Sequence, residues 1–162
     1  MAKGAAQFKK DLDQFVDEEI VEKALKLQRD IMTDLLGKVV LNTPVGERSR
    51  WQNNIRRKAR GLDPVPEGYV GGHARKNWQV TLNRPAVKEL KGQDKTGNRT
   101  LQVGEQRIAQ IKEPTIGYIT NLVPYIERLE QGHSTLQPNG FVKQSLQQIR
   151  IDYDMRLSLI HI

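Results

Sequence analysis

One apolar stripe runs through the first quarter of the chain and constrains the fold more than any other feature. Its members recur at spacings of mostly three and four, which places them on one helix face opposite the charged residues. They are Phe8, Leu12, Phe15, Val16, Ile20, Ala24, Leu27, Ile31, Leu35 and Val39. Pro44 ends the pattern because the residue before a proline avoids helical angles. We therefore predict a long helix over residues 1–41, about 55 Å long if it is continuous from residue 5.

Two interpretations of this helix stay open. It could overhang a compact body and reach neighbouring copies of the chain. It could also be broken near Gly37 and pack on its own core, as helices of ordinary length do.

A small antiparallel sheet is predicted in the region 77–139. Residues 77–82 alternate apolar and polar side chains, which is typical of a half-buried strand with Trp78, Val80 and Leu82 facing inward. Residues 115–120 form the second predicted strand, and we expect a further short strand over 100–103.

Between and after these strands the pattern changes. Residues 83–98 contain Pro85 and two glycines among charged residues, so we expect a mobile loop. Residues 104–112 predict a short helix that ends before Pro114.

The last segment, residues 140–162, fits two patterns. Its apolar residues recur at spacings of three and four, which favours a helix, whereas the alternation from Ile151 to Leu159 fits a strand. We favour the helix. The chain is therefore predicted to be one α+β domain, with a long N-terminal helix, a small antiparallel sheet, a C-terminal helix and a long basic loop over 47–76.

Length and composition exclude several classes of protein. The 162 residues make one ordinary domain, and the absence of cysteine excludes disulfides, thiolate catalysis and zinc–thiolate sites. No run reaches the roughly 20 apolar residues of a membrane span, and the N-terminus lacks the apolar segment of a signal peptide. We expect no membrane contact and a place in the cytoplasm of the producing cell.

The net charge of +7 is concentrated in one region. Residues 1–46 carry 7 basic and 8 acidic groups, residues 47–76 carry 8 and 3, and residues 77–162 carry 11 and 8. Prolines and glycines forbid a long regular element in the middle region, so we interpret it as an exposed basic excursion. Its candidate contact residues for DNA phosphates or an acidic partner protein are Arg48, Arg50, Trp51, Arg56, Arg57, Lys58 and Arg60. A merely solvated loop is the alternative, and no motif for sequence-specific base recognition is present.

Side chains suited to catalysis do not gather in the sequence. The three histidines are too far apart to form a metal-ligand pair on one helix turn. Glu127 and Glu130 are three residues apart and could share a helical face, but Arg128 beside them favours a solvated or interface ion cluster. We predict no catalytic residue, no metal site, no cofactor and no enzyme activity.

Three separated blocks, 39–46, 68–80 and 121–142, together resemble the neck, collar or tail-completion proteins of tailed bacteriophages, the minor tail protein Z-like family of head-to-tail connectors. The residues that carry the resemblance are Thr43, Pro44 and Val45 in the first block, Gly71, Gly72, Arg75, Asn77 and Trp78 in the second, and Asn121, Pro124, Tyr125, Glu130, Gly132, Ser134, Pro138 and Gly140 in the third. The chain departs from shorter relatives by the insertion of residues 47–67 between the first two blocks, and longer members carry comparable insertions.

The resemblance implies an α+β subunit that forms a ring of six or twelve copies. The ring would lie in the virion between portal or adaptor proteins and the tail terminator or tail-tube proteins, after assembly in the host cytoplasm, and packaged DNA would pass through its lumen. The long helix would serve core or intersubunit packing, and the basic loop would touch an adjacent ring or the DNA. A DNA-binding protein without sequence specificity, which uses the basic loop, is the alternative; a small hydrolase that uses Glu127 or Glu130 is the third class.

Overall fold

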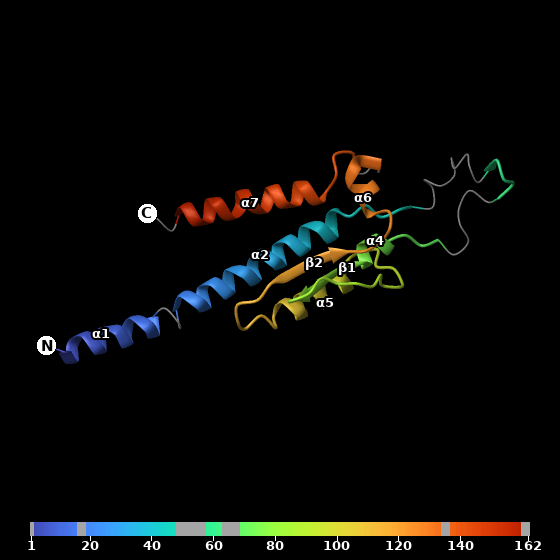
Figure 1. Ribbon diagram of the computed structural model, residues 1–162. Coiled ribbons are helices and arrows are strands. Elements are labelled where there is room, and N and C mark those ends of the chain that lie inside the picture. The colour runs from blue at the N-terminus through green and yellow to red at the C-terminus, as the bar shows by residue number, and fades with distance from the viewer. Residues whose placement is uncertain (1, 16–18, 48–57, 63–68, 134–136, 160–162) are drawn as a thin grey trace.

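The protein is α+β, with a helical frame around a two-stranded sheet (Figure 1). The computed structural model describes residues 2–15, 19–47, 58–62, 69–133 and 137–159. The elements are α1 (Ala2–Phe15), α2 (Val21–Asn42), α4 (His73–Lys76), β1 (Trp78–Leu82), α5 (Asn98–Ile108), β2 (Gly117–Asn121), α6 (Ile126–Arg128), a π-helical turn (Leu129–His133) and α7 (Val142–Leu159).

Helix α2 is the centre of the body. It packs against α5 and the sheet on one side and against α7 on the other, and α1 extends beyond the body at the N-terminal end (Figure 1). Two glycines permit these close approaches, because a Cβ on Gly104 of α5 would collide with Leu36 and a Cβ on Gly117 of β2 would collide with Met32.

The core is aliphatic with one aromatic pair. Trp78 and Phe141 meet edge to face with ring centroids 6.4 Å apart, which joins β1 to the start of α7. The buried members of the core are Leu25, Met32, Leu36, Val39, Val40, Trp78, Val80, Ile108, Ile111 and Phe141.

The predicted stripe does not mark the face of the helix that is buried in the core. Of its described side chains only Val39 is fully buried, while Leu27, Ile31 and Leu35 are half-buried. The remaining described members of the stripe are exposed: Phe8, Leu12, Ile20 and Ala24. The reason is that α2 buries apolar residues on two sides, toward the sheet with α5 and toward α7, so no single stripe describes it.

The predicted single helix over 1–41 is found as α1 and α2, with residues 16–18 between them outside the described part. The break near Gly37 is wrong, because Gly37 lies inside α2.

Both main strands are confirmed. β1 and β2 pair antiparallel, with Trp78 opposite Asn121 and Val80 opposite Ile119. Val80 and Trp78 are buried, as the alternation predicts.

The strand predicted at 100–103 is wrong, and so are the bounds of the helix predicted at 104–112. Both stretches belong largely to α5, which begins at Asn98 and ends at Ile108. A carboxylate stabilises the helix start at this point, because Asp94 Oδ2 accepts the backbone N–H of Thr100 at 2.8 Å within the first turn of α5.

The segment 83–97 contains no helix or strand, and side chains anchor it to the body through contacts described below. At the C-terminus the preferred interpretation is confirmed, since α7 is a helix. No helix in the described ranges is long and apolar enough to cross a membrane.

Candidate functional site

The residues of the first two resembling blocks meet where α2 ends, around the single turn α4. Arg75 joins three backbone segments there: its Nη2 donates to the carbonyls of Leu41 at 3.0 Å and Thr43 at 2.8 Å, and its Nη1 donates to that of Lys95 at 2.6 Å. The cation therefore satisfies carbonyls at the C-terminal end of α2, where the helix dipole is negative.

A shallow, open groove of about 330 Å³ lies beside this guanidinium. Its walls include Pro44 and Val45 of the first block, and Lys95 and Glu47 add charges of both signs. Because the groove is open and Arg75 already serves three carbonyls, it has the character of a surface depression rather than of an enclosed active site.

Thr43 and Trp78 form a buried polar link across the core. The indole Nε1–H of Trp78 donates to Thr43 Oγ1 at 2.7 Å, and that hydroxyl donates in turn to the carbonyl of Val39. Thr43 is fully buried, so the link fixes the Thr-Pro turn against β1.

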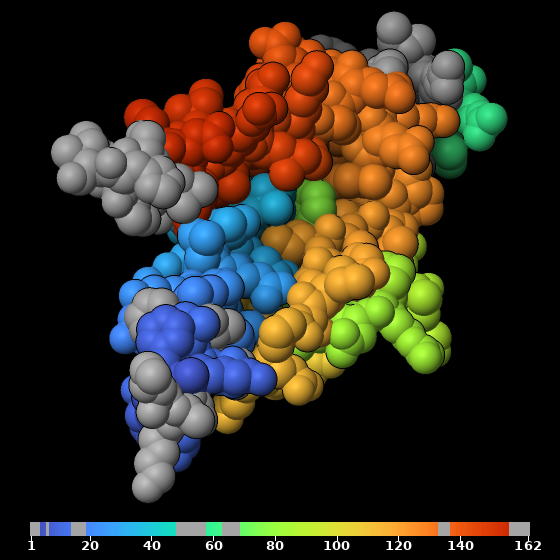
Figure 2. All heavy atoms as spheres, turned by 60° about the vertical axis from the view of Figure 1, so that its left-hand side comes forward, coloured from blue at the N-terminus to red at the C-terminus, as the bar shows by residue number. Residues whose placement is uncertain are grey.

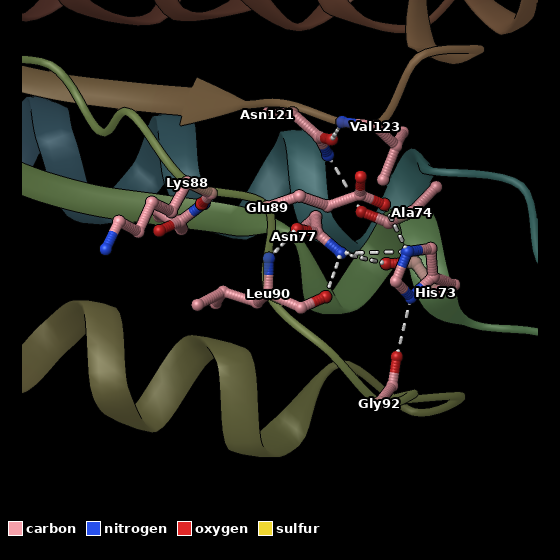
Figure 3. Close-up of polar contacts among 10 residues, drawn as sticks. His73, Ala74, Asn77, Lys88, Glu89, Leu90, Gly92, Asn121 and Val123 are labelled. Atoms are coloured by element: carbon pink, nitrogen blue, oxygen red, sulfur yellow. Dashed lines mark hydrogen bonds and ion pairs between the residues drawn. The ribbon is translucent and has the colours of Figure 1, made fainter.

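Asn77 holds the segment 83–97 over the sheet (Figure 3). Its side chain accepts the N–H of Leu90 at 2.6 Å and donates to the carbonyl of Leu90 at 3.0 Å, as a strand residue would. Gln79 repeats this two residues on, because its Nε2 donates to the carbonyl of Lys88 at 2.9 Å. The side-chain amides of Asn77 and Gln79 thus bind the backbone of residues 88–90, which does not form a third strand.

His73 makes a second clamp on the same segment (Figure 3). Its Nδ1 is 2.7 Å from the carbonyl oxygen of Gly92 and its Nε2 is 2.6 Å from Glu89 Oε1. Both partners accept, so both contacts are hydrogen bonds only when the ring carries two protons. The bond to Gly92 and then that to Glu89 raise the pKa of His73, against the opposing effect of burial.

Asn121 connects the third block to the second. Its Nδ2 donates to the carbonyl of Ala74 in α4 at 2.8 Å, and its Oδ1 accepts the N–H of Val123 at 3.3 Å (Figure 3). Pro124 and Tyr125 follow on the surface, where Tyr125 is 40% exposed.

Gly71 and Gly72 have positive φ angles of 76° and 83°. A Cβ on Gly72 would lie 2.8 Å from the backbone of Asp94, and one on Gly71 would collide with the carbonyl of Gly46. Only glycine lets these three chain segments meet.

Glu130 has a different role from the solvated or interface ion cluster that the sequence favoured. It caps the N-terminus of α7 and accepts the backbone N–H groups of Phe141 at 2.8 Å, Val142 at 2.8 Å and Lys143 at 2.9 Å. Burial raises the pKa of Glu130, but these three bonds and the charge of Lys143 outweigh it, so the pKa lies below the ordinary 4.5.

Two glycines shape the approach to this cap. Gly132 has a φ of 82° and Gly140 a φ of 77°. A Cβ on Gly132 would collide with the carbonyl of Pro138, and one on Gly140 would collide with Glu130. Pro138 itself is exposed, and Ser134 lies outside the described residues.

The predicted contact residues of the basic loop are mostly outside the described part. This holds for Arg48, Arg50, Trp51, Arg56 and Arg57. Lys58 and Arg60 are described, and both are exposed on a short turn closed by a hydrogen bond from Gly61 to Lys58.

A second basic surface was missed by the sequence interpretation. Its exposed cations are Arg84, Lys88, Lys91, Lys95 and Arg99. Of the two acids among them, Asp94 is buried against Thr100 and Gly97, whereas Glu89 contacts His73 and stays exposed. The charge count of residues 83–98 carried this signal, but nothing in the sequence told which acids were already engaged.

Large apolar side chains lie on several faces of the molecule. Phe8 is 69% exposed and Val87 is 84% exposed, Val103 is exposed on α5, and Ile116 is exposed just before β2. Single exposed apolar residues of this kind are common on protein surfaces and do not by themselves mark an interface.

Within the described ranges, no three His, Cys, Asp or Glu side chains gather closely enough to hold a metal ion.

Comparison of the chain with protein-family models, with curated proteins and with solved structures gave no match.

Proposed function

We propose that this protein is a structural subunit of a tailed-phage virion. In this proposal it forms a ring at the head-to-tail interface, joins the portal or adaptor assembly to the tail, and surrounds the DNA channel. It works by adhesion between shaped surfaces, and it has no catalytic role.

One observation supports the proposal most strongly: the side chains and glycines that carry the family resemblance join and shape backbone segments. Arg75 binds three carbonyls, and Asn77 binds the backbone of Leu90. Asn121 connects β2 to α4, and Glu130 caps α7. A family signature made of such residues describes a scaffold, because a catalytic signature would leave reactive groups pointing into a cleft.

The exposed surfaces fit the same proposal. In this proposal, the exposed apolar side chains on α1, on α5 and on the segment 83–97 would contact neighbouring copies or adjacent rings.

Light scattering after size exclusion tests the proposal, first with the protein alone at high concentration and then with a portal–adaptor complex. We expect a species of six or twelve copies, either alone or on the complex. A protein that stays monomeric in both experiments contradicts the proposal.

A second candidate function is DNA binding without sequence specificity, favoured by exposed Lys58 and Arg60 and by the surface around Lys88. It predicts tight duplex binding whose logarithm falls steeply with the logarithm of salt concentration. Neutralising Arg56, Arg57, Lys58 and Arg60 would then abolish binding, whereas the ring proposal expects weak or no binding by the isolated protein.

A further inference from the structure

Strand β2 has a partner strand on one edge only. The sheet has two strands, and β1 lies along one side of β2 (Figure 1). The backbone N–H of Asn83 donates to the carbonyl of Ile116 at 2.8 Å, which continues the register of the pair. Because alternate residues of an antiparallel pair bond to the partner strand, Tyr118 and Thr120 direct their backbone N–H and C=O groups toward β1.

The backbone N–H and C=O groups of Gly117, Ile119 and Asn121 therefore point away from β1. Among the described residues, no hydrogen bond reaches these groups of Gly117 or Ile119. Ile119 lies opposite Val80 on the same face of the sheet, yet Val80 is buried and Ile119 is only half-buried. Figure 2 shows the amber to orange residues around β2 at the surface, with a hollow between them and the red helix α7. This edge of β2 is open.

An open strand edge is a template for another strand. Its N–H and C=O groups repeat at every second residue, a spacing that an extended backbone matches. Proteins usually protect such an edge with charged residues, with proline or with a bulge. Strand β2 reads Gly-Tyr-Ile-Thr-Asn and pairs with β1 in unbroken register, so it has none of these. A sheet of two strands is also marginal by itself, and a further strand would stabilise it.

The sequence of β2 is suited to pair with a second copy of itself. In an antiparallel pair centred on Ile119, Gly117 of one copy lies opposite Asn121 of the other, and each outward N–H meets an outward C=O. The two Ile119 side chains lie opposite each other on one face of the sheet, and Tyr118 lies opposite Thr120 on the other. Pairs of β-branched and aromatic side chains of this kind stabilise sheets. Residues 114–126 carry no charge, so no like charges come together.

We propose that two copies of the chain pair through the open edges of β2. Their two-stranded sheets then join into one four-stranded antiparallel sheet across a two-fold axis. This inference goes beyond the proposed function, because a two-fold pair does not by itself close a ring.

Hydrogen exchange at single backbone amides, followed by NMR, tests the pairing on the unmodified protein. The amides of Tyr118 and Thr120 bond to β1 and should exchange slowly at every protein concentration. The Ile119 amide should exchange fast in dilute solution. It should exchange about tenfold more slowly when about nine-tenths of the molecules are paired, because exchange then proceeds from the remaining tenth.

Two results of this measurement would overturn the pairing. Slow exchange of the Ile119 amide in dilute solution would show that the chain covers its own edge. Fast exchange of that amide up to a protein concentration of about 1 mM would show that the edge does not pair with a second copy.

Cysteine cross-linking tests the register of the pair. Opposite residues that do not bond to each other have Cα atoms about 4.5 Å apart, which a disulfide can span. Tyr118→Cys and Thr120→Cys, prepared as separate variants and mixed with oxidised glutathione, should therefore give a disulfide-linked dimer on a non-reducing gel. The native chain contains no cysteine that could interfere. Val103→Cys, exposed on α5, is the matched control. Absence of the mixed dimer, or equal linking of Thr120→Cys to Val103→Cys, contradicts the register.

The same measurements distinguish this pairing from other uses of the edge. An Ile119 amide that stays unprotected in the isolated protein but becomes protected on a portal–adaptor complex would assign the edge to a strand of another protein and overturn the self-pairing. Rings in light scattering without concentration-dependent protection of Ile119 would leave the ring proposal standing and overturn the pair. Protection of Ile119 with no species larger than a dimer, alone or on the complex, would support the pair and contradict the ring.

Discussion

Replacement of Glu130 should destabilise the protein far more than replacement of its neighbour Glu127. Glu130 accepts three backbone N–H groups at 2.8 to 2.9 Å at the start of α7. Loss of a helix N-cap costs about 0.5–2 kcal/mol and a hydrogen bond to a charged group contributes about 1.5–3 kcal/mol. Water can reach the exposed end of the cap at Lys143, so Glu130→Ala should lower the free energy of unfolding by about 2–3 kcal/mol.

Thermal unfolding followed by circular dichroism checks this value. For a domain of this size, each kcal/mol shifts the midpoint by about 2–4 °C, so Glu130→Ala should unfold roughly 4–12 °C below the wild type. Glu130→Gln keeps one acceptor oxygen, so its unfolding midpoint should lie between those of the wild type and Glu130→Ala. The control Glu127→Gln changes an exposed side chain and should stay within about 0.5 kcal/mol.

The effect should also depend on pH. The pKa of Glu130 is lowered in the folded protein, so its contribution is fully present above the ordinary value of 4.5 and is lost as the pH falls through the folded pKa. The gap between wild type and Glu130→Ala should therefore close in acid. Equal stability of the two variants at neutral pH, or a gap that persists unchanged in acid, would refute the capping role.

Three further substitutions test the other polar contacts. Thr43→Val leaves the buried indole N–H of Trp78 without its acceptor and should lower the free energy of unfolding in urea by about 1–3 kcal/mol, whereas Thr43→Ser should retain most of it; similar losses in both would argue against the link. The pKa of His73 is raised, so its clamp is complete below the unfolded value of 6.5 and weakens as the pH rises through the folded pKa; hydrogen exchange at the Leu90 amide, corrected for intrinsic rates, should accelerate there in the wild type, and a pH response retained in His73→Gln would contradict the clamp. Asp94→Asn removes one carboxylate oxygen from the start of α5 and should cost about 1–2 kcal/mol in thermal unfolding; an unchanged midpoint would show that the cap contributes nothing.

Short-range patterns predicted the strands and the last helix well. Alternation over 77–82 identified β1 because Trp78 and Val80 are buried in the core, whereas Gln79 between them is only half-buried and donates to the carbonyl of Lys88. The spacing after Gly140 identified α7, in which Ile149 and Tyr153 are buried and the helix packs against α2, although Leu146 of the same pattern is exposed.

The errors arise from contacts that a short stretch of sequence does not show. The stripe in residues 1–41 was placed wrongly because α2 is buried from two directions, which depends on where α7 returns in space. The strand predicted at 100–103 is wrong because the helix found there, α5, is capped by Asp94, which acts across a turn that the local pattern does not show.

The candidate site illustrates the same limit. The sequence drew attention to Arg75 through the family resemblance and to Glu130 also through its spacing from Glu127, which favoured an ion cluster rather than a helix cap. Their roles follow from contacts 11 to 13 residues away for Glu130 and 20 to 34 residues away for Arg75. The burial of Asp94 and the contact of Glu89 with His73 could not be foreseen for the same reason.

The central claim is the proposed role in a tailed-phage virion, and deletion of the gene from the genome that encodes it, followed by electron microscopy of any phage particles produced, tests that claim most directly. We expect filled heads and separate tails to accumulate, and joined infectious virions to return when the protein is supplied from a plasmid. Joined, fully infectious particles in the absence of the protein would contradict a structural role at the head-to-tail interface.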